Sequence, residues 1–180
     1  MAESSFLNPA AALRAAKLHE GLTVADLGAG SGFFARAAAR EVGEEGRVWA
    51  LDIDGELLPR LRHLAEAENL NNIEVLRADI EHGSGLPASS VDLAIMSNIL
   101  FQLEDKAAAV KEAWRILRRG GRVLAMDWQA SFGGLGPAPG HIVTAREARK
   151  LFEEQGFTFV EDVPAGAYHW GFIMRKHRQS

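Results

Sequence analysis

The first residues that could do chemistry lie in "VADLGAGSG", residues 24–32, where three glycines and an aspartate follow an apolar run. They spell Asp-x-Gly-x-Gly-x-Gly from Asp26 to Gly32. A glycine loop between a strand and a helix presents backbone N–H groups at the positive end of the helix, where nucleotide-like ligands bind. Phe33 stands where the dinucleotide fingerprint needs its last glycine, and its ring would crowd a pyrophosphate. The motif therefore predicts a nucleotide-like ligand other than a dinucleotide.

Two more aspartates end apolar runs further along the chain. Asp52 closes "GRVWALD" at about the spacing where an acid binds ribose hydroxyls. It could instead cap a helix, although Asp54 is better placed for that role. Asp79 follows "IEVLRA" and reads either as a ligand contact or as a turn residue at the end of a strand. Asp26 has a similar alternative, because it could hydrogen-bond the amides of its own loop rather than the ligand.

The predicted helices and strands around these residues follow an α/β pattern. Five apolar runs alternate with helical patterns, which is typical of a largely parallel sheet. After them, Thr144 and Glu147 form a capping box ahead of another helix, and two final strands close the sheet as an antiparallel pair. Pro59 indicates a late or irregular start of its helix. We expect one domain over 1–180, with strands at 22–28, 46–53, 73–79, 91–97, 121–128, 157–163 and 168–174.

Between these runs the helical spacing predicts helices, one of which covers 103–119 and ends at Gly120-Gly121. The segment 130–141, "ASFGGLGPAPGH", is too rich in glycine and proline for regular structure and reads as a long exposed loop.

Composition narrows the chemistry further. The chain has no cysteine, which excludes disulfides, a thiolate metal site and a cysteine nucleophile. Its six histidines lack metal-ligand spacing, so no metal is expected. Twenty basic against 24 acidic residues give a net charge of -4, which disfavours nucleic acid as a partner. No apolar run is long enough to cross a bilayer and the start lacks the order of a signal peptide, so a cytoplasmic protein is expected.

With these residues in view, the chain resembles the class I S-adenosylmethionine-dependent methyltransferases. It is most similar to their small branch that looks like the quinone-biosynthesis methyltransferases (methyltransferase type 11). The resemblance rests on "VADLGAGSG", "ALDID", "RADI", "VDLAIMSNILFQL" and "LRRGGRVLAMDW" and extends from about Asn8 to about Met174. Arg119 replaces the commoner proline. The resemblance implies a Rossmann-like, mostly parallel seven-stranded sheet in the order 3-2-1-4-5-7-6, with strand 7 antiparallel and helices on both faces.

The same resemblance implies the cofactor S-adenosyl-L-methionine and a role for each motif residue. The loop from Gly28 through Ala29 to Gly30 would leave room for the methionyl portion, and the Gly28 and Ser97 carbonyls would accept from its ammonium group. Two ribose hydroxyls would donate to Asp52. The implied cofactor-binding residues are Asp26, Gly28, Ala29, Gly30, Asp52, Ile53, Asp79, Ile80 and Ser97.

The methyl acceptor is harder to read from the sequence. His141 ends the segment that lies over the acceptor pocket in resembling proteins, so it is the first candidate for a general base, with an exposed loop residue as the alternative. Asn98 either contacts the acceptor or ties down backbone. Trp128 could line the pocket or its rim. Tyr168 and His169 begin the last strand and read as structural.

The absence of one motif disfavours nucleic-acid acceptors, and the absence of cysteine excludes others. The stretch "SNIL" at 97–100 lacks the Asn/Asp-Pro-Pro-aromatic motif of the exocyclic-amine nucleic-acid enzymes, and the cysteine-dependent cytosine and arsenite members are excluded because the chain has no cysteine. Phe6 and Leu7 could fold over the cofactor or pack on the sheet edge. A small or hydrophobic acceptor is expected, such as a quinone precursor, with a protein side chain as the open alternative. The pocket is expected to be open or completed by the second subunit of a homodimer.

Three functions therefore remain open. The favoured one is methyl transfer to a small or hydrophobic acceptor. A non-catalytic domain that binds S-adenosylmethionine is the alternative, because no acceptor-side residue stands out. A nicotinamide-dependent oxidoreductase is suggested only by the glycine loop and Asp52, and both Phe33 and Asp26 speak against it.

Overall fold

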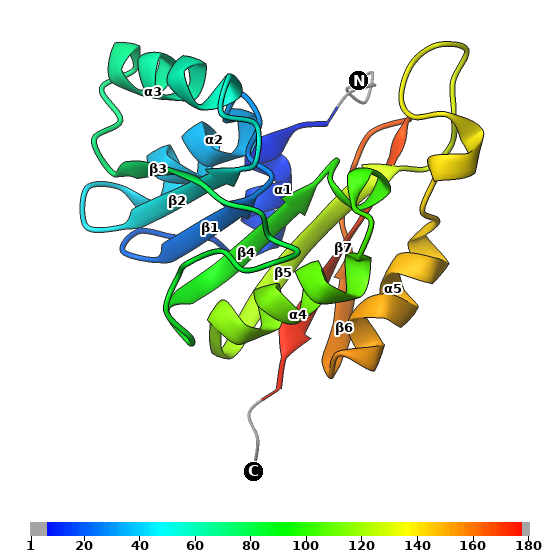
Figure 1. Cartoon of the computed structure of the whole chain (residues 1–180). Coiled ribbons are helices and arrows are strands. Elements are labelled where there is room, and N and C mark those ends of the chain that lie inside the picture. The colour runs from blue at the N-terminus through cyan, green and yellow to red at the C-terminus, as the bar shows by residue number, and fades with distance from the viewer. Residues whose placement is uncertain (1–6, 178–180) are drawn as a thin grey trace.

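The sheet has seven strands in the order β3-β2-β1-β4-β5-β7-β6, as expected from the sequence (Figure 1). The fold is that of a computed structural model, which describes residues 7–177. Strands β1 to β5 pair in parallel, and β7 runs antiparallel to both of its neighbours. The strands are β1 Thr23–Leu27, β2 Arg47–Asp52, β3 Ile73–Arg77, β4 Val91–Ser97, β5 Leu117–Trp128, β6 Phe157–Asp162 and β7 His169–Lys176.

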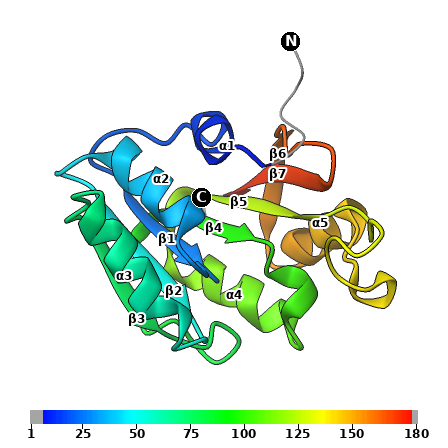
Figure 2. The same ribbon diagram turned by 90° about the horizontal axis from the view of Figure 1, so that it is seen from above.

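Helices cover both faces of the sheet. Figure 2 shows α1 and α2 on one side and α4 and α5 on the other. The longer helices are α1 Pro9–Ala15, α2 Phe33–Val42, α3 Leu57–Ala67, α4 Lys106–Ile116 and α5 Ala145–Glu154, and two short 3-10 turns are η1 Leu100–Gln102 and η2 Pro139–His141. Within residues 7–177, no helix is long and apolar enough to cross a membrane.

Strand β4 shows why the strands of this sheet are continuous apolar runs in the sequence. Its Ala94 and Met96 pack in the core with α4 and α5, whereas Leu93 and Ile95 pack in the core with α1 and α2. A parallel sheet covered on both faces buries successive side chains alternately on each side, so none of these positions can be polar. Such a core fixes the ends of the strands, and these ends carry the site.

The boundary between α4 and β5 differs from the sequence expectation. The helix ends at Ile116, not near Gly120, and Leu117 already pairs with Val91 of β4. The Lys176 ammonium group, on β7, donates to the carbonyls of Trp114 at 2.6 Å and Leu117 at 2.7 Å. This lysine satisfies carbonyls at the helix end that a glycine cap would otherwise serve.

Two local predictions concern helix starts. Thr144 and Glu147 form the expected capping box at the start of α5. Of the late or irregular start expected for α3, the late start is wrong, because the helix begins at Leu57 and holds Pro59 in its first turn, although no side chain caps it at Glu56. A proline is tolerated there, since first-turn N–H groups have no partner within the helix.

Candidate functional site

The glycine loop after β1 is held tightly against its neighbours. The N–H groups of Gly28 and Ala29 both donate to the Leu51 carbonyl of β2, at 2.9 and 2.8 Å. Gly28 has φ +86°, and a Cβ atom there would lie 2.7 Å from Cδ1 of Ile99. At Gly30, by contrast, a Cβ atom would meet nothing within 4 Å. The loop is thus packed on one side and leaves open space on the other.

Asp52 ties the loop to the end of β2. Its Oδ2 accepts from the N–H of Gly30 at 2.8 Å, and its Oδ1 accepts from the N–H of Asp54 at 2.9 Å. The next residue, Ile53, exposes 58% of its surface although it is large and apolar. An exposed isoleucine beside an anchored carboxylate is a surface that a ligand with a flat apolar part could cover.

Asp79 organises the turn after β3. Its Oδ1 accepts from the N–H of Glu81 at 3.0 Å, and its Oδ2 lies 2.8 Å from Nδ1 of His82. The hydrogen bond with His82 lowers the pKa of Asp79, and the same contact raises the pKa of His82. Asp79 therefore acts as the turn residue that the sequence allowed, and the turn that it holds places Ile80 on the cavity wall.

Asp26, in β1, has a carboxyl group that is buried without a partner in the part of the chain that the structure describes. Its side chain is 1% exposed, and neither oxygen has a hydrogen-bond partner among residues 7–177. Burial raises its pKa to about 7, against the effect of the Ala35 N–H, which faces the carboxyl without normal hydrogen-bond geometry. The charge of Asp52 raises it further. A buried carboxyl group with no partner indicates a site that a cationic or hydrogen-bonding ligand completes.

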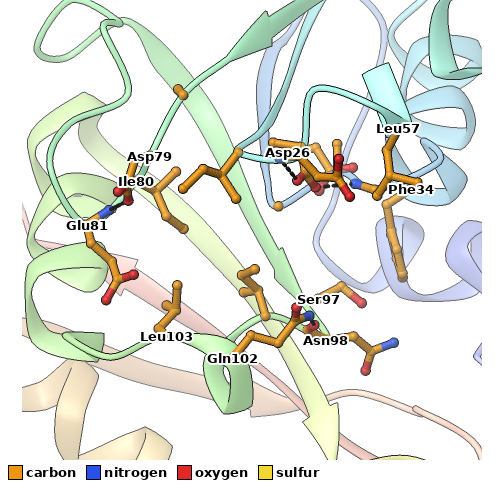
Figure 3. A pocket seen from close by; sticks show the side chains of 18 of the residues that line it. Asp26, Phe34, Leu57, Asp79, Ile80, Glu81, Ser97, Asn98, Gln102 and Leu103 are labelled. Atoms are coloured by element: carbon orange, nitrogen blue, oxygen red, sulfur yellow. Dashed lines mark hydrogen bonds between the residues drawn. The ribbon is translucent and has the colours of Figure 1, made fainter. Parts of the chain in front are cut away.

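These groups surround one cavity of about 1190 Å³ at the carboxyl ends of the parallel strands. Figure 3 shows Asp79, Ile80 and Glu81 on one side of it, with Asp26, Ser97 and Asn98 on the other. The cavity exceeds the usual upper size of a pocket for one small ligand, about 1,000 Å³, so it has room for a cofactor and a second molecule. All nine residues predicted to bind the cofactor line it: Asp26, Gly28, Ala29, Gly30, Asp52, Ile53, Asp79, Ile80 and Ser97.

Asn98 also lines this cavity, and its position depends on a residue that the sequence did not single out. The buried carboxylate of Asp127, at the end of β5, accepts from the N–H groups of Leu100 at 2.9 Å and Trp128 at 2.8 Å. Burial raises the pKa of Asp127 to about 6, although the amides of Trp128, Leu100, Phe101 and Ile99 oppose the shift. Asp127 thus anchors the turn that follows Asn98.

His169 is a second cavity residue whose importance the sequence did not reveal. It is the register partner of Trp128, and the two rings lie 4.4 Å apart at 39°. Its side chain is 7% exposed, and both ring nitrogens lack a partner within the described chain. Burial lowers its pKa. The antiparallel direction of β7 was the available signal, because it brings the first residue of that strand to the edge where the parallel strands end.

The structure does not bring His141 to this cavity. His141 is exposed in η2 and lines a separate cavity of about 710 Å³, together with Gln102, Leu103 and Glu104. Leu7 lies on the wall of the main cavity, whereas Phe6 falls outside the described residues. Between residues 7 and 177, no cluster of three His, Cys, Asp or Glu side chains is placed to hold a metal ion.

Comparison with known proteins identifies relatives of this arrangement. A family model described as a methyltransferase domain matches residues 25–125. An arsenite methyltransferase of Halobacterium salinarum is 29% identical over 161 residues, covering 83% of this chain and 40% of that protein. A ubiquinone/menaquinone biosynthesis C-methyltransferase of Haemophilus ducreyi is 33% identical over 117 residues, covering 62% of this chain and 43% of that protein.

Among solved structures, a SAM-dependent methyltransferase from Aquifex aeolicus is 27% identical, with a TM-score of 0.88 over 95% of this chain and 90% of that one. This chain spans less than half the length of the two curated relatives.

Proposed function

The chain belongs to the methyltransferase domain family, and we propose that it is an S-adenosylmethionine-dependent methyltransferase acting on a small or hydrophobic acceptor. The observation that carries this proposal is the buried Asp26 carboxyl group, which lines the cavity with both oxygens unpartnered. The cofactor has an ammonium group that would satisfy this carboxylate, whereas a nicotinamide dinucleotide would bring a pyrophosphate toward it. The residues present therefore fit the cofactor.

Each part of the cavity has a role toward the cofactor in this proposal. The open space at Gly30 accommodates the methionyl portion, and Asp52 accepts the ribose hydroxyls while its loop contacts hold it in place. Ile53 covers one face of the adenine, and Asp79 with the N–H of Ile80 binds the adenine edge. When bound, S-adenosylmethionine supplies a methyl group on a sulfonium, which is activated without help from the protein.

The protein then has to orient the acceptor toward the methyl group and exclude water. Arsenite is not a suitable acceptor, because soft ions are held by thiolates and the chain has no cysteine. We keep Asn98 as a residue that contacts the acceptor. His141 remains the sequence-based candidate for a general base, and that role requires the 130–141 loop to move toward the main cavity. A homodimer that completes the open side of the cavity stays a prediction, which light scattering would check.

Calorimetric titration with S-adenosylmethionine, S-adenosylhomocysteine and NADH tests the proposal. We expect micromolar binding of the first two ligands and none of NADH. Asp52→Ala should weaken both by ten-fold or more, about 1.4 kcal/mol. Asp162→Ala, which removes an exposed carboxylate of β6 far along the sheet, is the matched control and should leave both affinities unchanged. Binding of NADH without the other two would replace the proposal with the oxidoreductase function.

A further inference from the structure

We propose that the methyl acceptor is an uncharged hydroxyl compound that binds between Leu7, Asn98, Trp128 and His169, and that His169 receives the proton of its hydroxyl group. These four residues are called the acceptor compartment below. The inference rests on the proposed function, because it takes the part of the cavity that the cofactor residues leave free. It assigns the proton-accepting role to His169 rather than to His141.

The first observation is where the unpartnered polar groups lie. In the described chain, three side chains have buried polar atoms without a partner and make no other side-chain hydrogen bond: the buried Asp26 and His169, and the half-buried Asn98, whose Oδ1 atom alone is buried and unpaired. All three line the same cavity. A buried polar group without a partner costs about 1–3 kcal/mol, so three of them around one space indicate that ligands complete it. Asp26 is assigned to the cofactor, which leaves the Oδ1 atom of Asn98 and the ring nitrogens of His169.

The second observation concerns Trp128, whose ring contacts two other parts of the chain. His169 lies against one side of its ring. Gly136, with φ +80°, lies so close to the ring that a Cβ atom there would be 2.6 Å from Cε3 of Trp128. These two contacts hold the ring of Trp128 in place on the cavity wall. Aromatic rings favour offset-stacked or edge-to-face contacts with another ring, so a flat apolar body would be favoured in this compartment.

The third observation is the lack of charge in the compartment. Leu7, Asn98 and Trp128 are uncharged, and burial disfavours the charged form of His169. A carboxylate or phosphate on the acceptor would find no cationic partner among these four residues, and burying an unpaired charge is costly. A hydroxyl group suits them, because Asn98 Oδ1 and a neutral imidazole nitrogen are both acceptors.

These groups could support transfer of the methyl group to the acceptor oxygen. The acceptor oxygen forms the new bond to the methyl carbon, and the electron pair of the broken carbon–sulfur bond stays on sulfur. The hydroxyl proton passes to a ring nitrogen of His169 and leaves to water after the product departs. Because both nitrogens are shielded from water in the structure, this contact requires the imidazole to turn about its Cβ–Cγ bond.

The test uses the protein saturated with S-adenosylhomocysteine and two probes, 1-naphthol and naphthalene, which differ by one hydroxyl group. Calorimetry gives the ratio of their dissociation constants in the wild type, His169→Phe, His141→Phe and His63→Phe. The phenylalanine keeps an aromatic ring against Trp128 and removes both nitrogens, and its ring is larger by one atom. His63, exposed on α3, is the control for the same substitution elsewhere.

We expect His169→Phe to reduce the preference for 1-naphthol by about five-fold, as for a lost hydrogen bond, with the affinity for S-adenosylhomocysteine unchanged. The other two variants should keep the wild-type preference. An unchanged preference in His169→Phe, a loss in His141→Phe instead, or no binding of 1-naphthol would overturn the inference. Failure of S-adenosylhomocysteine to bind the wild type would instead refute the proposed function.

A second measurement tests whether His169 accepts the proton. With methyl-labelled S-adenosylmethionine, the wild type should convert 1-naphthol to 1-methoxynaphthalene, and His169→Phe should lower this rate by at least ten-fold. Product formation that does not depend on His169, or none in the wild type although 1-naphthol binds, would contradict that role.

Discussion

In the proposed function, Asp26 serves cofactor binding at the expense of stability. Its carboxyl group is buried without a hydrogen bond, and its pKa is raised to about 7. The unfolded chain ionises this group near pH 3.8, so between that pH and about 7 the folded state holds an extra proton. Stability therefore falls as the pH rises through this window.

The first prediction concerns Asp26→Asn. An amide needs no ionisation, so the variant should have a free energy of unfolding at pH 8 that is higher by about 2 to 4 kcal/mol, since each pKa unit corresponds to about 1.4 kcal/mol. The same change should weaken S-adenosylmethionine binding by at least ten-fold, because the ammonium group loses its counter-charge. Urea unfolding and calorimetry measure the two effects. A variant that is less stable yet binds normally would contradict the assignment.

The second prediction is a pH dependence of ligand binding. Below pH 7 the carboxyl group must lose its proton to pair with the ammonium group, so binding should release a proton. The affinity for S-adenosylhomocysteine should rise by up to about twenty-fold from pH 5.5 to pH 7.5 and then level off. Titrations in buffers of different ionisation enthalpy detect the proton. If Asp26→Asn shows the same slope, another group is responsible.

At the scale of elements, the turn η1 is fixed by contacts from two directions. Asp127 accepts from the amide of Leu100, and Ile99 packs where a side chain at Gly28 would stand. Gln102 closes the turn by donating from Nε2 to the carbonyl of Asn98 at 2.8 Å. The end of β5 and the glycine loop therefore determine together where Asn98 lies.

The third prediction tests this anchor. Asp127→Ala should lower the free energy of unfolding by about 2 to 3 kcal/mol, because it leaves buried backbone N–H groups unpaired. Asp127→Asn keeps an acceptor oxygen and should recover part of that loss. Denaturant unfolding of both variants at pH 7 gives the comparison. Equal stability of Asp127→Ala and the wild type would show that the turn holds itself.

Glu112 links α4 to the segment before β4 and supplies the fourth prediction. It accepts from the Ser84 N–H at 2.7 Å and from Nε of Arg115 at 2.7 Å. The Arg115 contact is the main reason that its pKa is lowered to about 2. The stabilisation is complete above pH 4.5, where the unfolded chain is ionised, and is lost as the pH falls toward 2.

Glu112→Gln should therefore be less stable than the wild type by roughly 1 to 3 kcal/mol at pH 7. The difference should shrink at pH 3. Urea unfolding at the two pH values measures this difference in the free energy of unfolding. An equal difference at both pH values would mean that the variant loses packing rather than charge interactions.

In the whole molecule, local sequence patterns predicted the type of sheet. The positions of His169 and Asp127, in contrast, depend on how distant strands pair. The apolar runs predicted a largely parallel sheet, because a sheet covered on both faces leaves a clear pattern, and the resemblance to the class I methyltransferases implied the strand order that the structure has. His169 and Asp127 could not be recognised in the same way. Their positions come from the register of β7 on β5 and from the turn that packs on β5, which are contacts between residues distant in the sequence.

The boundary of α4 was missed for a similar reason. Gly120-Gly121 looks like a local helix stop, but Lys176, about sixty residues later, satisfies the helix end earlier. His141 was a candidate only because its loop covers the pocket in resembling proteins, and here that residue lines a different cavity. Its role, like those of the predicted cofactor residues, stays a prediction until a ligand is bound.

A crystal structure of the protein with S-adenosylhomocysteine would show whether the main cavity is the cofactor site. We expect the ammonium group at Asp26, the ribose at Asp52 and the adenine between Ile53 and Asp79, with the space beside His169 still free for an acceptor. A ligand bound outside this cavity, or one that places its adenine against His169, would contradict this expectation.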